Sequence, residues 1–120
     1  MTSSVDGPVP DLADIHLAQA RIRSQVRVTP VLNDPGLDAI LECQLFCKCE
    51  NLQQPGSFKF RGASNAIARL RENDATGDVA THSSGNHGAA LALAARLDGR
   101  SAHVVMPENS SPIKVAAVRS

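Results

Sequence analysis

The fold is decided by residues 79–106, which read VATHSSGNHGAALALAARLDGRSAHVVM. Residues 79–81 are a short strand candidate, and residues 102–106 are a second one. Between them lie a glycine-containing loop and an alanine-rich helix over residues 89–97, which Gly99 ends. This order of strand, loop, helix and strand predicts an α/β fold in which the two strands pair in parallel.

Helices are predicted on both sides of this unit. Ser57 can cap a helix that runs to about Glu72, and a polar loop over residues 73–78 follows it. One stripe of this helix is expected to face the core, and it consists of Phe58, Gly62, Ala66 and Leu70. A last helix begins near Pro112 and is still running at Ser120, so a truncated domain is expected.

Shorter elements are predicted in the first half of the chain. Residues 1–10 are polar and expected to be loose, and a helix follows from Asp11 to about Val26, capped by Asp11 or Asp14. The pair Thr29-Pro30 ends this helix. A short strand at residues 31–32 and a short helix at 37–41 come next. A strand at 44–50 then places Leu45, Cys47 and Cys49 on one face, where the cysteines are expected to be small core residues.

The composition excludes several classes of function. The chain has 120 residues, with 12 basic and 12 acidic side chains, a formal net charge of zero, and no Trp or Tyr. Neither a nucleic acid nor an anionic membrane is therefore an expected partner. No apolar run reaches membrane-spanning length and the start, MTSSVDGPVP, lacks the pattern of a signal peptide, so a cytoplasmic location is expected. The three cysteines, crowded into residues 43–49, do not supply the paired ligands of a structural metal site, and no metal site is expected.

A lysine stands between two phenylalanines in GSFKFRGA, residues 56–63. Burial of Lys59 between the two rings would favour the neutral amine, which is the form that attacks a carbonyl to form an imine. The residues alone leave a second interpretation open. In it, Lys59 is a surface lysine whose stem packs on Phe58 while its ammonium group reaches water.

The second unusual segment is THSSGNHG, residues 81–88, which joins a strand to a helix. Backbone N–H groups at such a junction attract a carboxylate or a phosphate, and Gly85 and Gly88 let the backbone approach a ligand closely. Ser84 offers a hydroxyl for proton transfer, and Asn86 offers a fixed amide. The alternative is a capped turn whose polar residues only satisfy the end of the helix.

Two other catalytic patterns have little support. Residues 111–114 match the Ser-x-x-Lys pattern of penicillin-recognising enzymes, but no later Ser-Asp-Asn or Lys-Thr-Gly triplet accompanies it. Ser83 or Ser84 with His82 or His87 would suggest a serine hydrolase, but the Gly-x-Ser-x-Gly elbow is missing.

Three motifs together resemble one enzyme family. KCEN at 48–51, GSFKFRGA at 56–63 and THSSGNHG at 81–88 are similar, in order and spacing, to pyridoxal-phosphate enzymes of fold type II. Within that fold type, they resemble the threonine/serine dehydratase and serine racemase family. TPVL at 29–32 stands where that family has its threonine–proline–leucine segment, and the resemblance runs from about Asp14 to the end of the chain.

The resemblance implies an architecture for this chain. The expected fold is the α/β, tryptophan synthase β-like fold of type II, a parallel sheet with flanking helices, here truncated. A flexible arm is expected at residues 1–13, the start of the large cofactor-binding domain at 14–52, and a truncated part of the small α/β domain at 53–120.

The resemblance also implies roles for individual residues. Lys59 would hold pyridoxal 5'-phosphate covalently as the Schiff-base lysine and would take the α-proton of the substrate on one face. Phe58 would lie against the pyridine ring, and Asn86 would hydrogen-bond the 3-hydroxyl oxygen. The substrate carboxylate would be held by Ser83, Ser84, Gly85, Asn86 and His87. Ser84 would also protonate or deprotonate Cα from the opposite face.

The implied reaction is the α,β-elimination of L-threonine- or L-serine-type hydroxy amino acids to a 2-oxo acid and ammonia, with serine racemisation as a second outcome. The alternative is a catalytically incompetent, truncated or accessory fragment, because the family's glycine-rich phosphate loop and acidic divalent-cation ligands have no counterpart in this chain. A divalent cation is possible in the full-length protein, which would be a homo-oligomer acting on a small amino-acid substrate.

Overall fold

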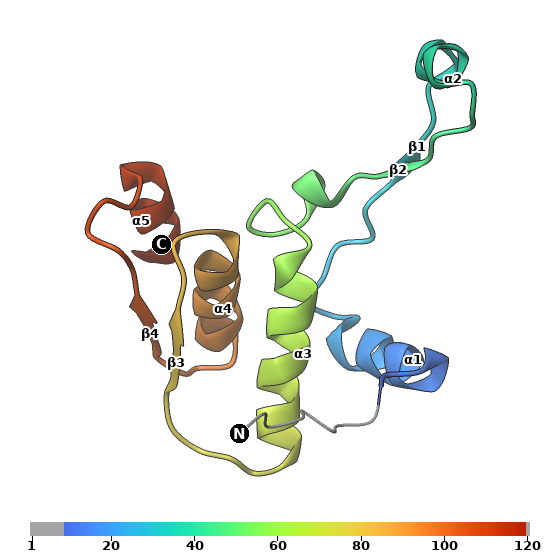
Figure 1. The fold of residues 1–120 in the computed structure, drawn as a ribbon. Coiled ribbons are helices and arrows are strands. Elements are labelled where there is room, and N and C mark those ends of the chain that lie inside the picture. Colours follow the sequence, from blue (N-terminus) through green and yellow to red (C-terminus); the bar gives the residue numbers. More distant parts are fainter. Residues whose placement is uncertain (1–8, 120) are drawn as a thin grey trace, which may run out of the picture.

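The computed structural model describes residues 9–119, and a parallel βαβ unit forms its second half. Strand β3 (Val79–His82) leads through a short loop into helix α4 (Asn86–Leu97), which returns the chain to strand β4 (Ala102–Val105). The two strands pair in parallel, with Val79 opposite Ala102 and His82 opposite Val105 (Figure 1). The predicted parallel α/β unit is confirmed. Its helix begins three residues earlier than expected.

Helix α3 (Lys59–Glu72) packs against α4 and forms the core. Phe60 is fully buried, and Ile67 lies beside it against the alanine-rich face of α4. The α4 side chains in this cluster are Ala90, Leu91, Ala94 and Ala95. Because alanine side chains are short, the phenyl ring of Phe60 can reach close to the α4 backbone, and burying such a ring contributes about 2–3 kcal/mol.

The expected core stripe of α3 is wrong except for Leu70, which is partly buried against the core. The buried residues are Phe60, Ala63, Ser64, Ile67 and Ala68, whereas Phe58, Gly62 and Ala66 are exposed. Both faces of α3 carry small apolar residues, so periodicity alone did not distinguish them. The expected cap is also wrong, because the helix begins at Lys59 with Phe58 at the N-cap position and no side-chain cap.

Helix α1 (Leu12–Ile22) lies along α3. Asp11, one of the two expected candidates, is its N-cap and forms a capping box in which Asp11 and Asp14 each accept from the other's backbone N–H. Arg21 holds α1 to α3 through Glu72 and Asn65. The helix ends at Ile22, earlier than predicted. Of the flexible N-terminal segment expected at residues 1–13, residues 1–8 lie outside the described residues, and Leu12 and Ala13 belong to α1.

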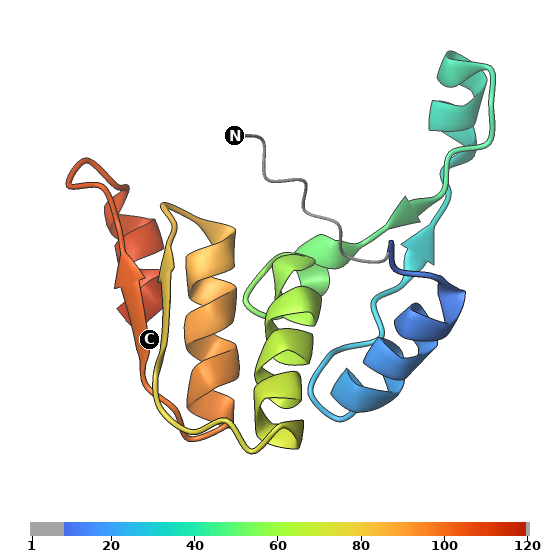
Figure 2. The ribbon, with the colours of Figure 1, turned by 60° about the horizontal axis from the view of Figure 1, so that its bottom comes forward.

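A protruding segment follows, which we call the arm and define as residues 28–49. It contains strand β1 (Val31–Leu32), helix α2 (Pro35–Leu41) and strand β2 (Cys47–Lys48), and the two strands pair antiparallel. Figures 1 and 2 both show it extending away from the helices. The strand predicted at 44–50 is therefore mostly irregular. Cys47 is exposed and Cys49 half-buried, so the expectation that they pack in the core is wrong.

An ion pair joins the base of the arm to the start of α3. Arg61 donates from Nε and Nη2 to the two carboxylate oxygens of Glu50, at 2.8 and 2.7 Å. Thr29 donates its hydroxyl to the same carboxylate. Glu50 begins the short 3-10 helix η1 (Glu50–Leu52). Because Arg61 donates to it from two nitrogens, the pKa of Glu50 is lowered from 4.5 to about 2.

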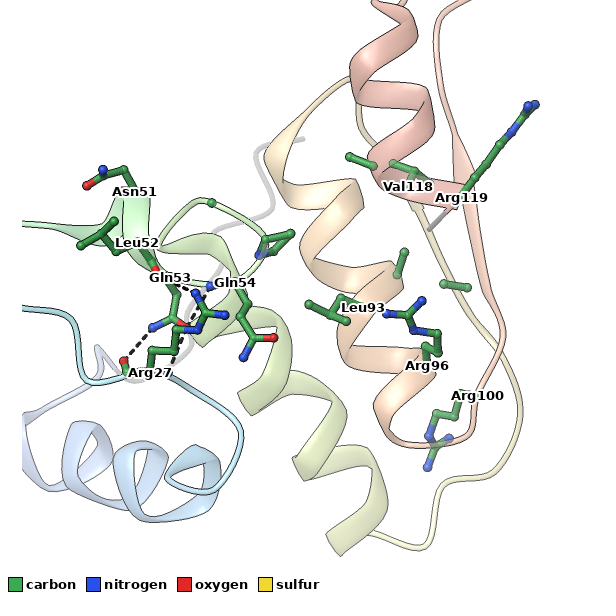
Figure 3. A pocket seen from close by; sticks show the side chains of 15 residues that line it. Arg27, Asn51, Leu52, Gln53, Gln54, Leu93, Arg96, Arg100, Val118 and Arg119 are labelled. Atoms are coloured by element: carbon green, nitrogen blue, oxygen red, sulfur yellow. Dashed lines mark hydrogen bonds between the residues drawn. The ribbon is translucent and has the colours of Figure 1, made fainter.

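A buried glutamine reinforces the same junction. Gln53 is 2% exposed, and its side chain accepts from the N–H of Arg27 at 3.0 Å and donates to the carbonyl of Arg27 at 2.8 Å (Figure 3). Both amide atoms of Gln53 are thereby satisfied, which a buried side chain of this kind requires.

Helix α5 (Pro112–Arg119) packs on α4, and the expected extension to Ser120 lies outside the described residues. No helix within residues 9–119 has the length and apolar character to cross a membrane. The same residues contain no group of three or more His, Cys, Asp or Glu side chains placed to hold a metal ion.

Stability is expected to fall in acid because of Glu50. Its folded pKa lies below the value of 4.5 for a free side chain, so its stabilising contribution is complete above about pH 4.5 and is lost as the pH falls towards 2. Replacing it in Glu50→Gln should reduce the free energy of unfolding at pH 7 by about 1–3 kcal/mol and weaken this pH dependence. Urea unfolding at a series of pH values measures both effects.

The matched control is Glu72→Gln. Glu72 also pairs with an arginine, Arg21, but its side chain is 52% exposed, so the loss should be about 0.5 kcal/mol or less. Equal losses of unfolding free energy in the two variants would show that the Glu50–Arg61 pair stabilises the fold no more than the exposed Glu72–Arg21 pair.

Candidate active site

The two sequence motifs meet at one end of the molecule. Lys59 is the first residue of α3 and Asn86 is the first residue of α4, and both helices start at the same end in Figures 1 and 2. The carboxyl ends of β3 and β4 lie at that end too. In open α/β sheets this is the edge where ligands bind, because helix N-termini and strand ends expose unpaired backbone groups there.

A cavity of about 370 Å³ lies beside Lys59. Its lining comes from α3, β3 and α4 and consists of Phe58, Lys59, Gly62, Ala63, Ala66, Ala80, Thr81, His87 and Leu91. Most of these side chains are small, which leaves room for a planar ring. The structure thus brings Lys59 of the first motif and His87 of the second to one cavity, although they are far apart in the sequence.

Lys59 is exposed, so of the two interpretations left open by the sequence, burial between two phenylalanines is wrong and a surface lysine beside Phe58 is confirmed. Successive residues of a helix are separated by about 100°, so Phe58 and Phe60 point to different sides. Phe60 enters the core, while Phe58 is 58% exposed and its ring centroid lies 4.9 Å from Lys59 Nζ. The amine therefore stands at the open mouth of the cavity, against one aromatic face.

Ser83 holds the second motif in shape. Its Oγ accepts from the N–H groups of Gly85, at 3.2 Å, and Gly88, at 3.0 Å, and so it satisfies the first turn of α4. The side chains of Ser84, Asn86 and His87 are exposed at the same end. Those three are the side chains of this loop that remain available to a ligand.

Gly88 serves packing rather than ligand approach, which corrects the expectation for this residue. It is buried, and a Cβ placed there would lie 3.0 Å from Cγ1 of Val104 and 3.3 Å from Cβ of Ser83. Gly85 lies at the open side of the loop, and its Cβ position is 3.8 Å from Lys114 Nζ. The sequence did not indicate that Lys114 lies close to this loop, because helix α4 and strand β4 separate the loop from α5 along the chain.

A larger cavity, of about 700 Å³, lies between the 51–56 segment, α4 and α5. Arg27, Arg96, Arg100 and Arg119 line it, and Figure 3 shows Arg119 pointing away from the others. Arg100 is held by Asp98 at 2.7 Å. None of the residues predicted to be catalytic or cofactor-binding lines this cavity, so the smaller cavity beside Lys59 is the candidate active site.

The chain belongs to the pyridoxal-phosphate dependent enzyme family, whose model matches residues 22–120. The family and the type II fold expected from the motifs are confirmed. A primary amine at the mouth of a small apolar cavity, beside a polar loop at a helix N-terminus, also fits a cofactor that has an aldehyde and an aromatic ring.

Particular relatives are similar over almost the whole chain. Serine racemase of Oryza sativa is 50% identical over 113 residues, covering 94% of this chain and 33% of the relative. The beta-hydroxyaspartate dehydratase of Paracoccus denitrificans is 44% identical and covers 92% of the chain and 35% of the relative. The structure of maize serine racemase matches with a TM-score of 0.84 and 48% identity, over 91% of this chain and 33% of that one. The chain spans about a third of the length of these relatives.

Glycine 88 provides a test of the loop packing. The variant Gly88→Ala is expected to lower the free energy of unfolding by about 1–2 kcal/mol, because Val104 and Ser83 must move to admit the methyl group. The control is Gly62→Ala, where a Cβ meets nothing within 4 Å and the helix should gain about 0.5–1 kcal/mol. If urea unfolding showed the same gain in unfolding free energy for both variants, the close packing at Gly88 would not disfavour a Cβ there.

Proposed function

We propose that this chain is the catalytic N-terminal part of a pyridoxal-phosphate enzyme that removes ammonia from L-threonine- or L-serine-type hydroxy amino acids, yielding a 2-oxo acid, and that also racemises serine. The observation that carries the proposal is the exposed amine of Lys59 at the mouth of a cavity shared with His87. Relatives named serine racemase and beta-hydroxyaspartate dehydratase support this reaction class.

We assign Lys59 as the residue that binds the cofactor covalently and moves the α-proton. We assign Phe58, whose ring centroid lies 4.9 Å from Lys59 Nζ, to the face of the cofactor ring, and Asn86 to a hydrogen bond with its 3-hydroxyl oxygen. When bound, pyridoxal phosphate withdraws electrons from Cα of the substrate. The chain's own task is then to orient the substrate and to transfer protons.

We assign the loop from Ser83 to His87 to the substrate carboxylate. Backbone N–H groups in the first turn of a helix favour an anion, and Ser83 holds this turn in place through its bonds to Gly85 and Gly88. The exposed hydroxyl of Ser84 would protonate or deprotonate Cα on the face opposite Lys59. Elimination needs one such residue and racemisation needs both, so one site supports both outcomes.

The proposal extends to the organisation of the protein. Residues 14–52 would begin the large cofactor-binding domain, and residues 53–120 would form part of the small domain. The full-length protein would be a cytoplasmic homo-oligomer that takes small amino acids. The second candidate function is an accessory chain without catalysis, and the observation that favours it is the match to only a third of each relative.

Cofactor attachment can be tested on the chain itself. Incubation with pyridoxal phosphate, reduction with borohydride and peptide mapping should label Lys59, because its amine is exposed beside a cavity lined by both motifs. Lys59→Ala should abolish this label, and Lys114→Ala should leave it in place. Scattered labelling of all the lysines, unchanged in Lys59→Ala, would contradict the assignment.

The role of Ser84 can be tested in a chimera in which this chain replaces the matching first third of maize serine racemase. Ser84→Ala is expected to lower serine racemisation by about 10²–10⁴-fold and elimination by much less, because elimination does not need a proton donor on that face. Chiral chromatography and 2-oxo acid formation measure the two rates. A control, Ser101→Ala, should change neither rate, and equal losses of both in Ser84→Ala would contradict the role.

A further inference from the structure

The cavity beside Lys59 contains few groups that can exchange a proton. Of the nine residues that line it, only Lys59, Thr81 and His87 have polar side chains. The Thr81 hydroxyl donates to the carbonyl of His82 at 3.4 Å, and an aliphatic hydroxyl does not ionise near neutral pH. Within residues 9–119, Lys59 and His87 are therefore the two acid–base groups of this cavity.

The backbone around His87 is fixed, and its ring is open. His87 is the second residue of α4, and Ser83 Oγ accepts from the N–H groups of Gly85 and Gly88 on either side of it. Among the described residues none forms a hydrogen bond or an ion pair with the His87 ring, whereas His103 is paired with a carboxylate at 3.1 Å. The exposed ring of His87 is thus available to a substrate in the cavity.

The proposed elimination needs a second acid–base group, at the hydroxyl that leaves. Lys59 takes the α-proton, and Ser84 serves Cα from the opposite face in racemisation. The β-hydroxyl is a poor leaving group, because it departs as hydroxide unless it is protonated while the Cβ–O bond breaks. A positioned acid contributes about 10²–10⁴-fold to such a step, and histidine is the side chain most often used for it.

We propose that His87 is the general acid that protonates the departing β-hydroxyl of the substrate. This inference rests on the proposed function and deepens it, since it assigns the group that the elimination branch needs and the racemisation branch does not. The carrying observation is that His87 shares a small cavity with Lys59, which removes the α-proton.

The atoms of this step balance without a further reactant. The electron pair of the Cα–H bond forms the second Cα–Cβ bond while Lys59 keeps the proton. The Cβ–O bond breaks, and its oxygen takes the ring proton of His87 and leaves as water. The His87 ring regains a proton from solvent, to which it is exposed. The enamine takes up one water and yields the 2-oxo acid and ammonia.

The test uses the chimera with maize serine racemase and the variant His87→Gln. Pyruvate formation from L-serine should fall by about 10²–10⁴-fold, because hydroxide must then leave unprotonated. Pyruvate formation from β-chloro-L-alanine should fall by about threefold at most, because chloride leaves without a proton. Serine racemisation should also change by about threefold at most, since no hydroxyl leaves in that reaction.

The three rates separate an acid from a residue that only binds the substrate. Loss of carboxylate binding through His87 slows all three reactions alike, so equal losses would overturn the proposal. The matched control is His82→Gln, which changes an exposed histidine at the end of β3, outside the lining of the cavity, and should leave all three rates unchanged. If the unaltered chimera converts none of these substrates, the proposed function is wrong and this inference falls with it.

A measurement without turnover tests the position of the His87 ring. Pyridoxal phosphate is fixed on Lys59 of the 120-residue chain by borohydride, and diethyl pyrocarbonate then modifies the histidines, which are mapped by mass spectrometry. The bound group should slow the modification of His87 by about 10-fold or more, because Lys59 and His87 line one small cavity. His16, exposed on α1, should react at an unchanged rate. Equal rates at His87 with and without the bound group would also overturn the proposal.

Discussion

The packing of α3 against α4 is the contact on which the rest of the structure depends. Phe60 and Ile67 lie against a face of α4 made largely of alanine, which brings the two helices close together over several turns. Because both helices start at the same end, this contact places Lys59 beside the loop that precedes α4. A larger residue at Ala90 or Ala94 would separate the helices and so separate the two halves of the candidate site.

A second constraint ties the arm to this site. Arg61 lies two residues after Lys59 and forms the bidentate pair with Glu50, while Gln53 fixes the backbone of Arg27. The ion pair is charge-assisted and partly shielded from water, so it helps to fix the direction in which the arm extends from the start of α3.

Under the proposed function, this chain would supply one wall of an active site. The amine of Lys59 and the first turn of α4 are both open to solvent in this chain. Pyridoxal-phosphate chemistry works best where water is excluded, because electrostatic interactions with the reacting groups are then stronger.

The sequence by itself determined the order of the elements, the parallel βαβ unit, an aspartate cap on α1 and the two motifs that define the family, because each depends on local chemistry or short spacing. The roles of Phe58 and Phe60 depended on which side of α3 faces α4, which both helices decide together. The packing of Gly88 on Val104 and the exposure of Cys47 were likewise decided only by the tertiary structure. These features depend on contacts between residues distant in the chain, and periodicity along one segment carries no information about its partner.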